Sequence, residues 1–158
     1  CELLDFEVTQ ESDGAGVAEK LNGGMPQGLH VLDCYPAQRP VRELAWLRAA
    51  VELEYDAGVP EGAADALREL LARSELIIQK RTKRKELADV DIAPMIGKVE
   101  LSEEPHLIRG TVTVRAQNPG LNPQLLEKAI VKYRPDLQPD FMRVRRLAFL
   151  DEAGNNFR

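Results

Sequence analysis

Cysteine, histidine and aromatic residues are all scarce in this chain. Its 158 residues include two cysteines and two histidines, and aromatic side chains make up 5% of the total. Cys1 and Cys34 form no C-x-x-C pair, so the usual zinc spacings and a disulfide framework have no basis here. The glycine-rich nucleotide motifs and the common hydrolase motifs are absent as well. We therefore expect no metal site, no cofactor and no catalytic residue in this chain.

Long apolar runs are also missing. No stretch approaches the roughly 20 apolar residues that cross a bilayer, and no cationic leader followed by an apolar segment precedes the first predicted strand. Apolar residues at 44% and charged residues at 30% are ordinary for a globular domain. These features predict a cytoplasmic protein with no membrane contact.

Charge is present in quantity but is unevenly distributed. Residues 1–74 carry 6 Lys or Arg against 14 Asp or Glu, a net of -8, and residues 75–158 carry 15 against 12, a net of +3, which together give the -5 of the whole chain. The basic half contains the segment QKRTKRK at residues 79–85. Such a run either docks an anionic partner or forms the solvated tip of a hairpin, and both interpretations stay open. The candidate binding residues are Lys80, Arg81, Lys83, Arg84 and Lys85, with Arg109 and Arg115 from a later strand.

The first 40 residues predict an incomplete β-α-β piece. Apolar and acidic residues alternate from Leu4 to Val8, which predicts a half-buried strand. A short helix follows over residues 15–21 and a second strand over residues 29–35. Because the first strand begins abruptly, we expect the chain to be a fragment of a longer protein. Residues 41–47 then predict a short helix in which Trp46 anchors the core.

Residues 41–150 predict a ferredoxin-like α+β sandwich with an extra hairpin strand. Strands are expected at residues 51–55 and 76–82, a hairpin at 99–101 with 107–115, and a last strand at 141–150. Helices are expected after Pro60 and after Asn122, each with an apolar stripe. The order β-α-β, hairpin, α-β matches a sheet with helices on one face. Residues 151–158 are expected to be a frayed polar tail.

The same fold is that of the RNA-recognition motif, so an RNA-binding role must be weighed. That motif stacks bases on aromatic side chains of its exposed sheet face, and Thr111 and Thr113 stand where those aromatics belong. A weaker electrostatic mode remains, in which arginines of the sheet act together with the basic loop. Its members are Arg109, Arg115, Arg143 and Arg145. Glu52 and Glu54 on a neighbouring strand are expected to compete for them.

The sequence resembles a bacterial family of radical SAM-linked proteins, which are encoded beside or fused behind a radical SAM iron-sulfur enzyme. The matching segments are ELLDFE at 2–7, LNGGMP at 21–26, GLHV at 28–31, AAVEL at 49–53, KRK at 83–85 through VDIAP at 90–94, NPQLL at 122–126 and VRR at 144–146. The family's N-terminal segment, rich in His, Leu and Asp and followed by a Gly-Phe-x-Pro turn, is not in this chain. The resemblance implies a radical SAM enzyme as partner and implies no catalytic residues.

Three functions follow as hypotheses. The first is an accessory domain that helps a radical SAM enzyme to bind its substrate or partner, since a cofactor carries the chemistry and protein groups position it. The second is an RNA-binding module that uses the basic loop. The third is an enzyme whose site is completed by the N-terminal segment of the family.

Overall fold

The structure is a computed structural model that describes residues 2–9, 13–81 and 86–157. The chain divides into two compact units, an N-terminal unit from Glu2 to Arg42 and a C-terminal unit from Glu43 to Phe157. The predicted binding residues Lys83, Arg84 and Lys85 lie outside the described residues. No helix in the described part of the chain is long and apolar enough to span a membrane.

The N-terminal unit has one helix among its described residues, α1 (Gly14–Gly24). Its first turn is capped by Asp13, whose carboxylate accepts a hydrogen bond from the amide of Gly16. Asn22 holds the segment that follows. Its side chain donates to the carbonyl of Val31 at 3.1 Å and accepts from the amide of Val31 at 2.7 Å. The predicted helix is therefore confirmed, with three more residues at its C-terminal end.

The two strands predicted on either side of α1 are wrong. Residues 2–9 and 13–42 contain no strand in the structure. At Val31, the side chain of Asn22 occupies both backbone groups with which a strand would pair. Leu4 and Leu32 remain 72% and 85% exposed, so the apolar side of the alternation is not packed on a sheet. The expected β-α-β piece is instead a helix between irregular segments.

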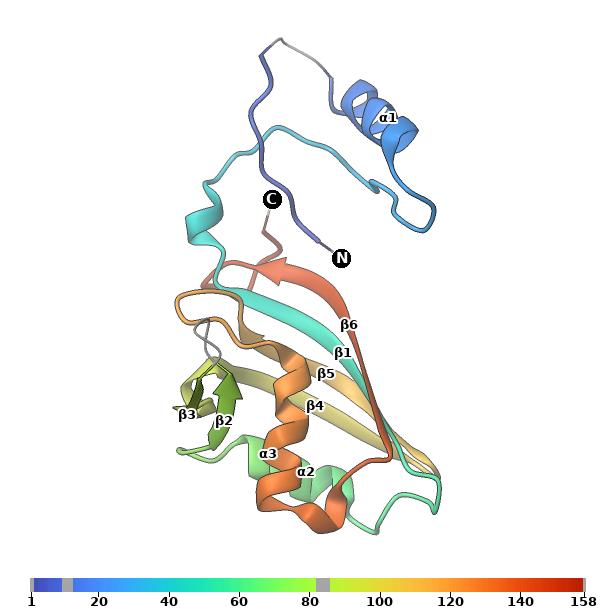
Figure 1. Ribbon diagram of the computed structural model, residues 1–158, viewed down its shortest axis with the longest axis vertical. Coiled ribbons are helices and arrows are strands. Elements are labelled where there is room, and N and C mark those ends of the chain that lie inside the picture. The colour runs from blue at the N-terminus through green and yellow to red at the C-terminus, as the bar shows by residue number, and fades with distance from the viewer. Residues whose placement is uncertain (1, 10–12, 82–85, 158) are drawn as a thin grey trace. The chain divides into compact units, whose positions relative to one another are not determined.

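The C-terminal unit is built on a four-stranded antiparallel sheet (Figure 1). Its strands are β1 (Trp46–Glu54), β4 (Ile96–Glu104), β5 (Leu107–Arg115) and β6 (Phe141–Leu150), in the spatial order β4-β5-β1-β6. β1 pairs along its whole length with β5 on one side and β6 on the other. The predicted hairpin and last strand are confirmed, and the unit is an α+β fold.

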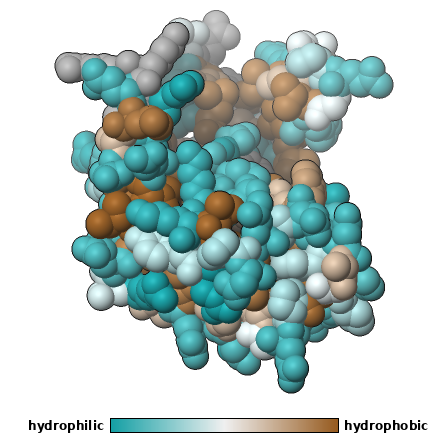
Figure 2. All heavy atoms as spheres, turned by 60° about the horizontal axis from the view of Figure 1, so that its bottom comes forward, coloured by the Kyte–Doolittle hydropathy of each residue, from teal (hydrophilic) through white to brown (hydrophobic). Residues whose placement is uncertain are grey.

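Two helices, α2 (Ala63–Leu71) and α3 (Leu126–Tyr133), cover the same face of this sheet (Figure 1). Both predicted helices are thereby confirmed. The core between helices and sheet is formed by Leu47, Val51 and Leu53 of β1, Val112 of β5, Leu67 and Leu70 of α2, and Leu126 and Ile130 of α3. Glu103 of β4 accepts a hydrogen bond at 3.1 Å from the amide of Ala64, which places a carboxylate at the positive end of α2. The face seen in Figure 2 is largely hydrophilic, with separate hydrophobic patches.

The expected extra strand is one arm of a second, two-stranded antiparallel sheet. β2 (Ile77–Arg81) lies within the strand predicted at residues 76–82, and it pairs with β3 (Leu87–Asp91), which the sequence did not predict. The carboxylate of Asp91 accepts hydrogen bonds from the amides of Leu76 at 2.8 Å and Ala93 at 3.0 Å. This side chain therefore ties the start of β2 to the end of β3. Ile78 packs into the common core and anchors the hairpin there.

The helix predicted for residues 41–47 is wrong. Only Val41–Glu43 form a short 3₁₀ turn, and Trp46 already belongs to β1. The reason lies at Ala45, whose amide donates to the carbonyl of Leu150 at 3.0 Å and whose carbonyl accepts from the amide of Ala116 at 2.9 Å. These bonds continue the sheet beyond β1 and leave no donor for a helical turn.

The C-terminal tail is not frayed over its described residues. The amide of Phe157 donates to the carbonyl of Phe149 at 2.8 Å, and the Phe157 side chain is buried. Asp151 is buried too, and its carboxylate accepts from the amide of Asn155. The buried Phe157 side chain and these hydrogen bonds together hold the segment against β6.

Candidate interaction surfaces

The predicted binding residues separate into two groups on different sides of the C-terminal unit. Lys80 and Arg81 end β2, and this strand lies against α3 on the helix-covered side of the sheet. Arg109 and Arg115 belong to β5, where the intervening residues Ile108 to Val114 alternate between core and surface. Their side chains project from the sheet face opposite the helices. The predicted set is therefore not one site.

We call the sheet face opposite α2 and α3 the open face. Strand register brings one set of side chains together there. Its members are Trp46, Arg48, Ala50, Glu52 and Glu54 of β1; Glu100, Ser102 and Glu104 of β4; Leu107, Arg109, Thr111, Thr113 and Arg115 of β5; and Phe141, Arg143 and Arg145 of β6.

Most arginines of the open face are paired with carboxylates. Arg109 contacts Glu104 at 3.0 Å, and Arg143 contacts both Glu52 at 3.3 Å and Glu54 at 3.4 Å. The expectation that these two glutamates compete for arginine is confirmed at Arg143. Exposed pairs of this kind contribute about 0–1 kcal/mol each, so their effect is on the pattern of charge rather than on stability.

Arg115 is held more completely than the other arginines. Its guanidinium donates to both carboxylate oxygens of Glu152, at 2.6 and 2.9 Å, and lies 3.9 Å from the centre of the Trp46 ring. The hydrogen bond to Glu152 raises the pKa of Arg115, and the same bond lowers the pKa of Glu152. Arg115 is therefore a fixed part of the open face and is already occupied.

Trp46 was expected in a helix and lies instead on the open face. A Cβ added at Gly97 would come within 3.3 Å of the Trp46 ring, so glycine leaves room for the indole to lie over β4. Phe141, 52% exposed, stands at the other end of the face. Thr111 and Thr113 do occupy the central positions, but aromatic side chains are present at the ends of the sheet.

Two open-face arginines form no ion pair with a described residue, although the pKa of the nearby Glu100 is lowered by Lys98, Thr111 and Arg48. In the described ranges 2–9, 13–81 and 86–157, neither Arg48 nor Arg145 forms an ion pair. Arg145 is opposite Ala50, and Arg48 lies two residues before Ala50 on the same face of β1. Two guanidinium groups therefore flank a small side chain in the middle of the sheet. Arg48 was not among the predicted residues.

The second group of cations lies along the outer edge of β2. From α3, the Lys128 ammonium donates to the carbonyl of Gln79 at 3.1 Å, and the Lys132 ammonium donates to the carbonyl of Ile77 at 2.7 Å. Tyr133 joins them, since its hydroxyl accepts from the amide of Ile77 at 3.0 Å. The edge strand is thereby covered by side chains of α3.

We call Lys80, Arg81, Lys128 and Lys132 the hairpin surface. None of the four pairs with a carboxylate among the residues that the structure describes. The acidic residues that follow the basic run in sequence, Glu86, Asp89 and Asp91, form no ion pair with these four among the described residues. Asp91, for instance, is occupied by the amides of Leu76 and Ala93. Sequence reasoning missed Lys128 and Lys132, although their spacing of four places both on one face of a helix.

No three side chains of His, Cys, Asp or Glu gather closely enough to hold a metal ion in the part of the chain that is described. No curated protein and no solved structure matches the chain. A family model does match, over residues 1–123, which include the N-terminal unit and β1 to β5. The matched part is well over half of the 158 residues. The chain therefore belongs to the bacterial family described as "Uncharacterized protein conserved in bacteria (DUF2344)".

Proposed function

We propose that this protein is an accessory domain of a radical SAM enzyme and that it binds its partner protein through the open face. The observation that carries the proposal is the pair Arg48 and Arg145, two neighbouring arginines that form no ion pair in the described residues on a face where the other arginines do. The radical SAM enzyme as partner is supported by the resemblance of this chain to the radical SAM-linked proteins.

The charge of the open face favours a protein over a nucleic acid as its ligand. Around it stand six cations, Arg48, Lys98, Arg109, Arg115, Arg143 and Arg145, and five carboxylates, Glu52, Glu54, Glu100, Glu104 and Glu152. A polyanion laid across this face would meet all five carboxylates, and like charges brought together are unfavourable. A protein surface with a few acidic side chains can instead place them at Arg48 and Arg145.

The chemical character of the face supports the same conclusion. Arginine and large aromatic residues are enriched at protein interfaces, and they supply a large part of the binding energy there. Trp46 and Phe141 stand at the two ends of the face, with Arg48 and Arg145 between them. Sheet strands hold these side chains in fixed register, which limits the entropy lost on binding.

The strand order of the C-terminal unit favours a more specific fold than α+β alone. The spatial order β4-β5-β1-β6, with every neighbouring pair antiparallel, supports a ferredoxin-like arrangement in which α2 and α3 are the two crossover helices. The β2-β3 sheet is then an insertion in the first crossover. A cytoplasmic location fits this role and is supported by the free thiol of Cys34.

The proposal is tested with the full-length protein and a radical SAM enzyme of the kind that the resemblance implies as its partner. The double variant Arg48→Glu with Arg145→Glu reverses two charges on the open face. We expect it to weaken the complex at least tenfold, which corresponds to about 1.4 kcal/mol. The matched control is Lys20→Glu with Arg68→Glu, which makes the same charge change on α1 and α2. Equal affinity of both variants and the unaltered protein would contradict the proposal.

A further inference from the structure

Unpaired cations of the C-terminal unit concentrate on the hairpin surface, whereas most cations of the open face are paired. Lys80, Arg81, Lys128 and Lys132 have no carboxylate partner in the described residues, and Arg73 lies beside them, 5.5 Å from the centre of the Tyr133 ring. We infer that the hairpin surface binds the phosphate backbone of a single-stranded RNA. This site is separate from the open face and does not depend on the function proposed for that face.

The cations form a row because helix and strand have matching repeats. Four residues of α-helix rise about 6 Å, and two residues of a strand rise about 6.6 Å. Lys128 and Lys132 therefore stay in step with Gln79 and Ile77 along the edge of β2, as their hydrogen bonds show. Arg81 lies two residues beyond Gln79 on the same face of β2, whereas Lys80 lies on the other face with Ile78. A single strand with one phosphate at every nucleotide can follow such a row.

The ammonium groups retain donors for a ligand. Each Lys ammonium has three N–H donors, and the bonds to Gln79 and Ile77 use one donor on Lys128 and one on Lys132. Those same bonds fix the two ammonium positions, so less side-chain entropy is lost when an anion binds. The contacts with the carbonyls thus order the two lysine side chains and leave N–H donors on each ammonium for a phosphate.

The neighbouring acidic residues do not cancel this charge. Asp89 faces Gln79 across the hairpin, and Glu86 directly precedes β3. Glu127 is adjacent to Lys128 in α3, but neighbours in sequence point to different sides of a helix. None of these three carboxylates pairs with the row among the described residues. The surface remains cationic on the side that α3 and β2 share.

The set of cations is chemically suited to phosphate, and three of the four are lysines. A lysine ammonium binds phosphate as a compact point charge, and the planar fork of arginine binds phosphate oxygens as well. Leu87, opposite Arg81, is 64% exposed, and Val131, between the two lysines in α3, is 41% exposed. These apolar side chains lie next to the row, where the bases of a bound strand could contact them.

The experiment measures binding of the full-length protein to a short fluorescent oligouridylate over a range of salt concentrations. The test variant is Lys128→Gln with Lys132→Gln, which removes two charges but keeps a donor for each carbonyl of β2. Each phosphate contact on a single strand contributes about 0.7 to the slope of log affinity against log salt, so this slope should fall by about 1.4. Over a fourfold rise in salt, the unaltered protein should lose about sevenfold more affinity than the variant.

Three controls make the result decisive. Arg109→Gln with Arg143→Gln removes two charges on the open face and should leave the slope unchanged. Lys128→Arg with Lys132→Arg keeps the charges and should keep the slope, and thermal unfolding of each variant checks that the hairpin stays folded. An unchanged slope in the Lys→Gln variant, or no oligouridylate binding at low salt, would overturn the inference. Equal competition by polyglutamate of the same charge would also overturn it, because the site would then suit an acidic protein.

Discussion

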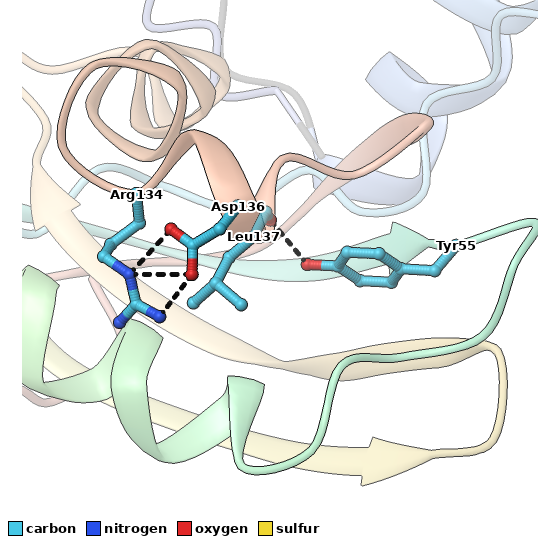
Figure 3. A network of polar contacts seen from close by, with 4 residues as sticks. All are labelled: Tyr55, Arg134, Asp136 and Leu137. Atoms are coloured by element: carbon cyan, nitrogen blue, oxygen red, sulfur yellow. Dashed lines mark hydrogen bonds and ion pairs between the residues drawn. The ribbon is translucent and has the colours of Figure 1, made fainter.

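Tyr55 gives the sharpest test of how the C-terminal unit holds together. It follows β1, is 5% exposed, and its hydroxyl donates to the carbonyl of Leu137 at 3.0 Å (Figure 3). That carbonyl belongs to the turn Pro135–Leu137, which Arg134 and Asp136 fix through three hydrogen bonds of 2.7 to 3.2 Å. Burial, assisted by the charges of Asp140 and Glu103, raises the pKa of Tyr55 to about 12.

The sign of the pH effect follows from that shift. Tyr55 keeps its proton in the folded state up to a pKa of about 12, whereas the unfolded chain loses it near the ordinary value of 10.0. As pH rises, the unfolded chain therefore deprotonates before the folded protein does, and this favours unfolding. The stability that Tyr55 contributes to the folded state declines from about pH 10 upwards. By about pH 11 the free energy of unfolding has fallen by about 1.4 kcal/mol. Over that one pH unit the folded state binds about one more proton than the unfolded state.

The variant Tyr55→Phe separates this effect from all other alkaline titrations. Near neutral pH it should be less stable by about 1–2 kcal/mol, because the buried carbonyl of Leu137 loses its donor. At about pH 11 the difference between the two proteins should shrink by about 1.4 kcal/mol, since only the unaltered protein carries the titrating hydroxyl. Urea denaturation at several pH values measures both quantities. A difference that stays constant from neutral to alkaline pH would refute the reasoning.

Three further predictions concern the core, the sheet and the hairpin. Leu67→Ala removes a fully buried side chain of α2 and should destabilise the protein by about 3 kcal/mol and lower Tm by about 6–12 °C, measured by thermal unfolding; a Tm within a degree or two of the unaltered protein would contradict the described core. Gly110→Ala should prevent correct pairing of β4 with β5, because the new Cβ would overlap the carbonyl oxygen of Glu100; a native sheet spectrum with unchanged stability would show that this register is wrong. Asp91→Ala should release the base of the hairpin and cost about 1–3 kcal/mol, since two amides lose their acceptor. Asp91→Asn keeps an acceptor and should restore most of that loss, and equal losses in both variants would contradict the capping role.

Much of the C-terminal unit was predictable from the sequence because its pattern is regular. Apolar and charged residues alternate along β1 and β6, and the stripe of α2 includes Leu67 and Leu70 at helical spacing. β3 was missed because it is short, with only Ala88 and Val90 alternating with Asp89 and Asp91, and because it follows directly on a basic run.

The N-terminal unit was mispredicted for a different physical reason. Alternation shows that a segment could form a strand, but it doesn't show whether a partner strand exists. At Val31 the side chain of Asn22 takes the partner's place, and no periodicity in the sequence indicates this. The start of β1 was missed likewise, because the bonds of Ala45 to residues 116 and 150 join segments far apart in the chain.

The candidate surfaces could be predicted only in part. Charged residues of β5 and of the basic run were evident, but a sequence does not reveal which arginines are neutralised. The pairing of Arg109, Arg115 and Arg143 with glutamates depends on strand order. The importance of Lys128 depends on how α3 lies along β2. Which cations lack an ion pair can be identified only once the positions of the strands and of α3 are known.

The central claim is that the open face binds the partner protein. Oxidative footprinting of the full-length protein, alone and in complex with the radical SAM enzyme, tests it most directly. Trp46 and Phe141 report on the open face, and Tyr133 reports on the side of α3 and the hairpin. We expect oxidation of Trp46 and Phe141 to fall sharply in the complex while that of Tyr133 stays the same. Protection of Tyr133 with unchanged oxidation of Trp46 and Phe141 would contradict the claim.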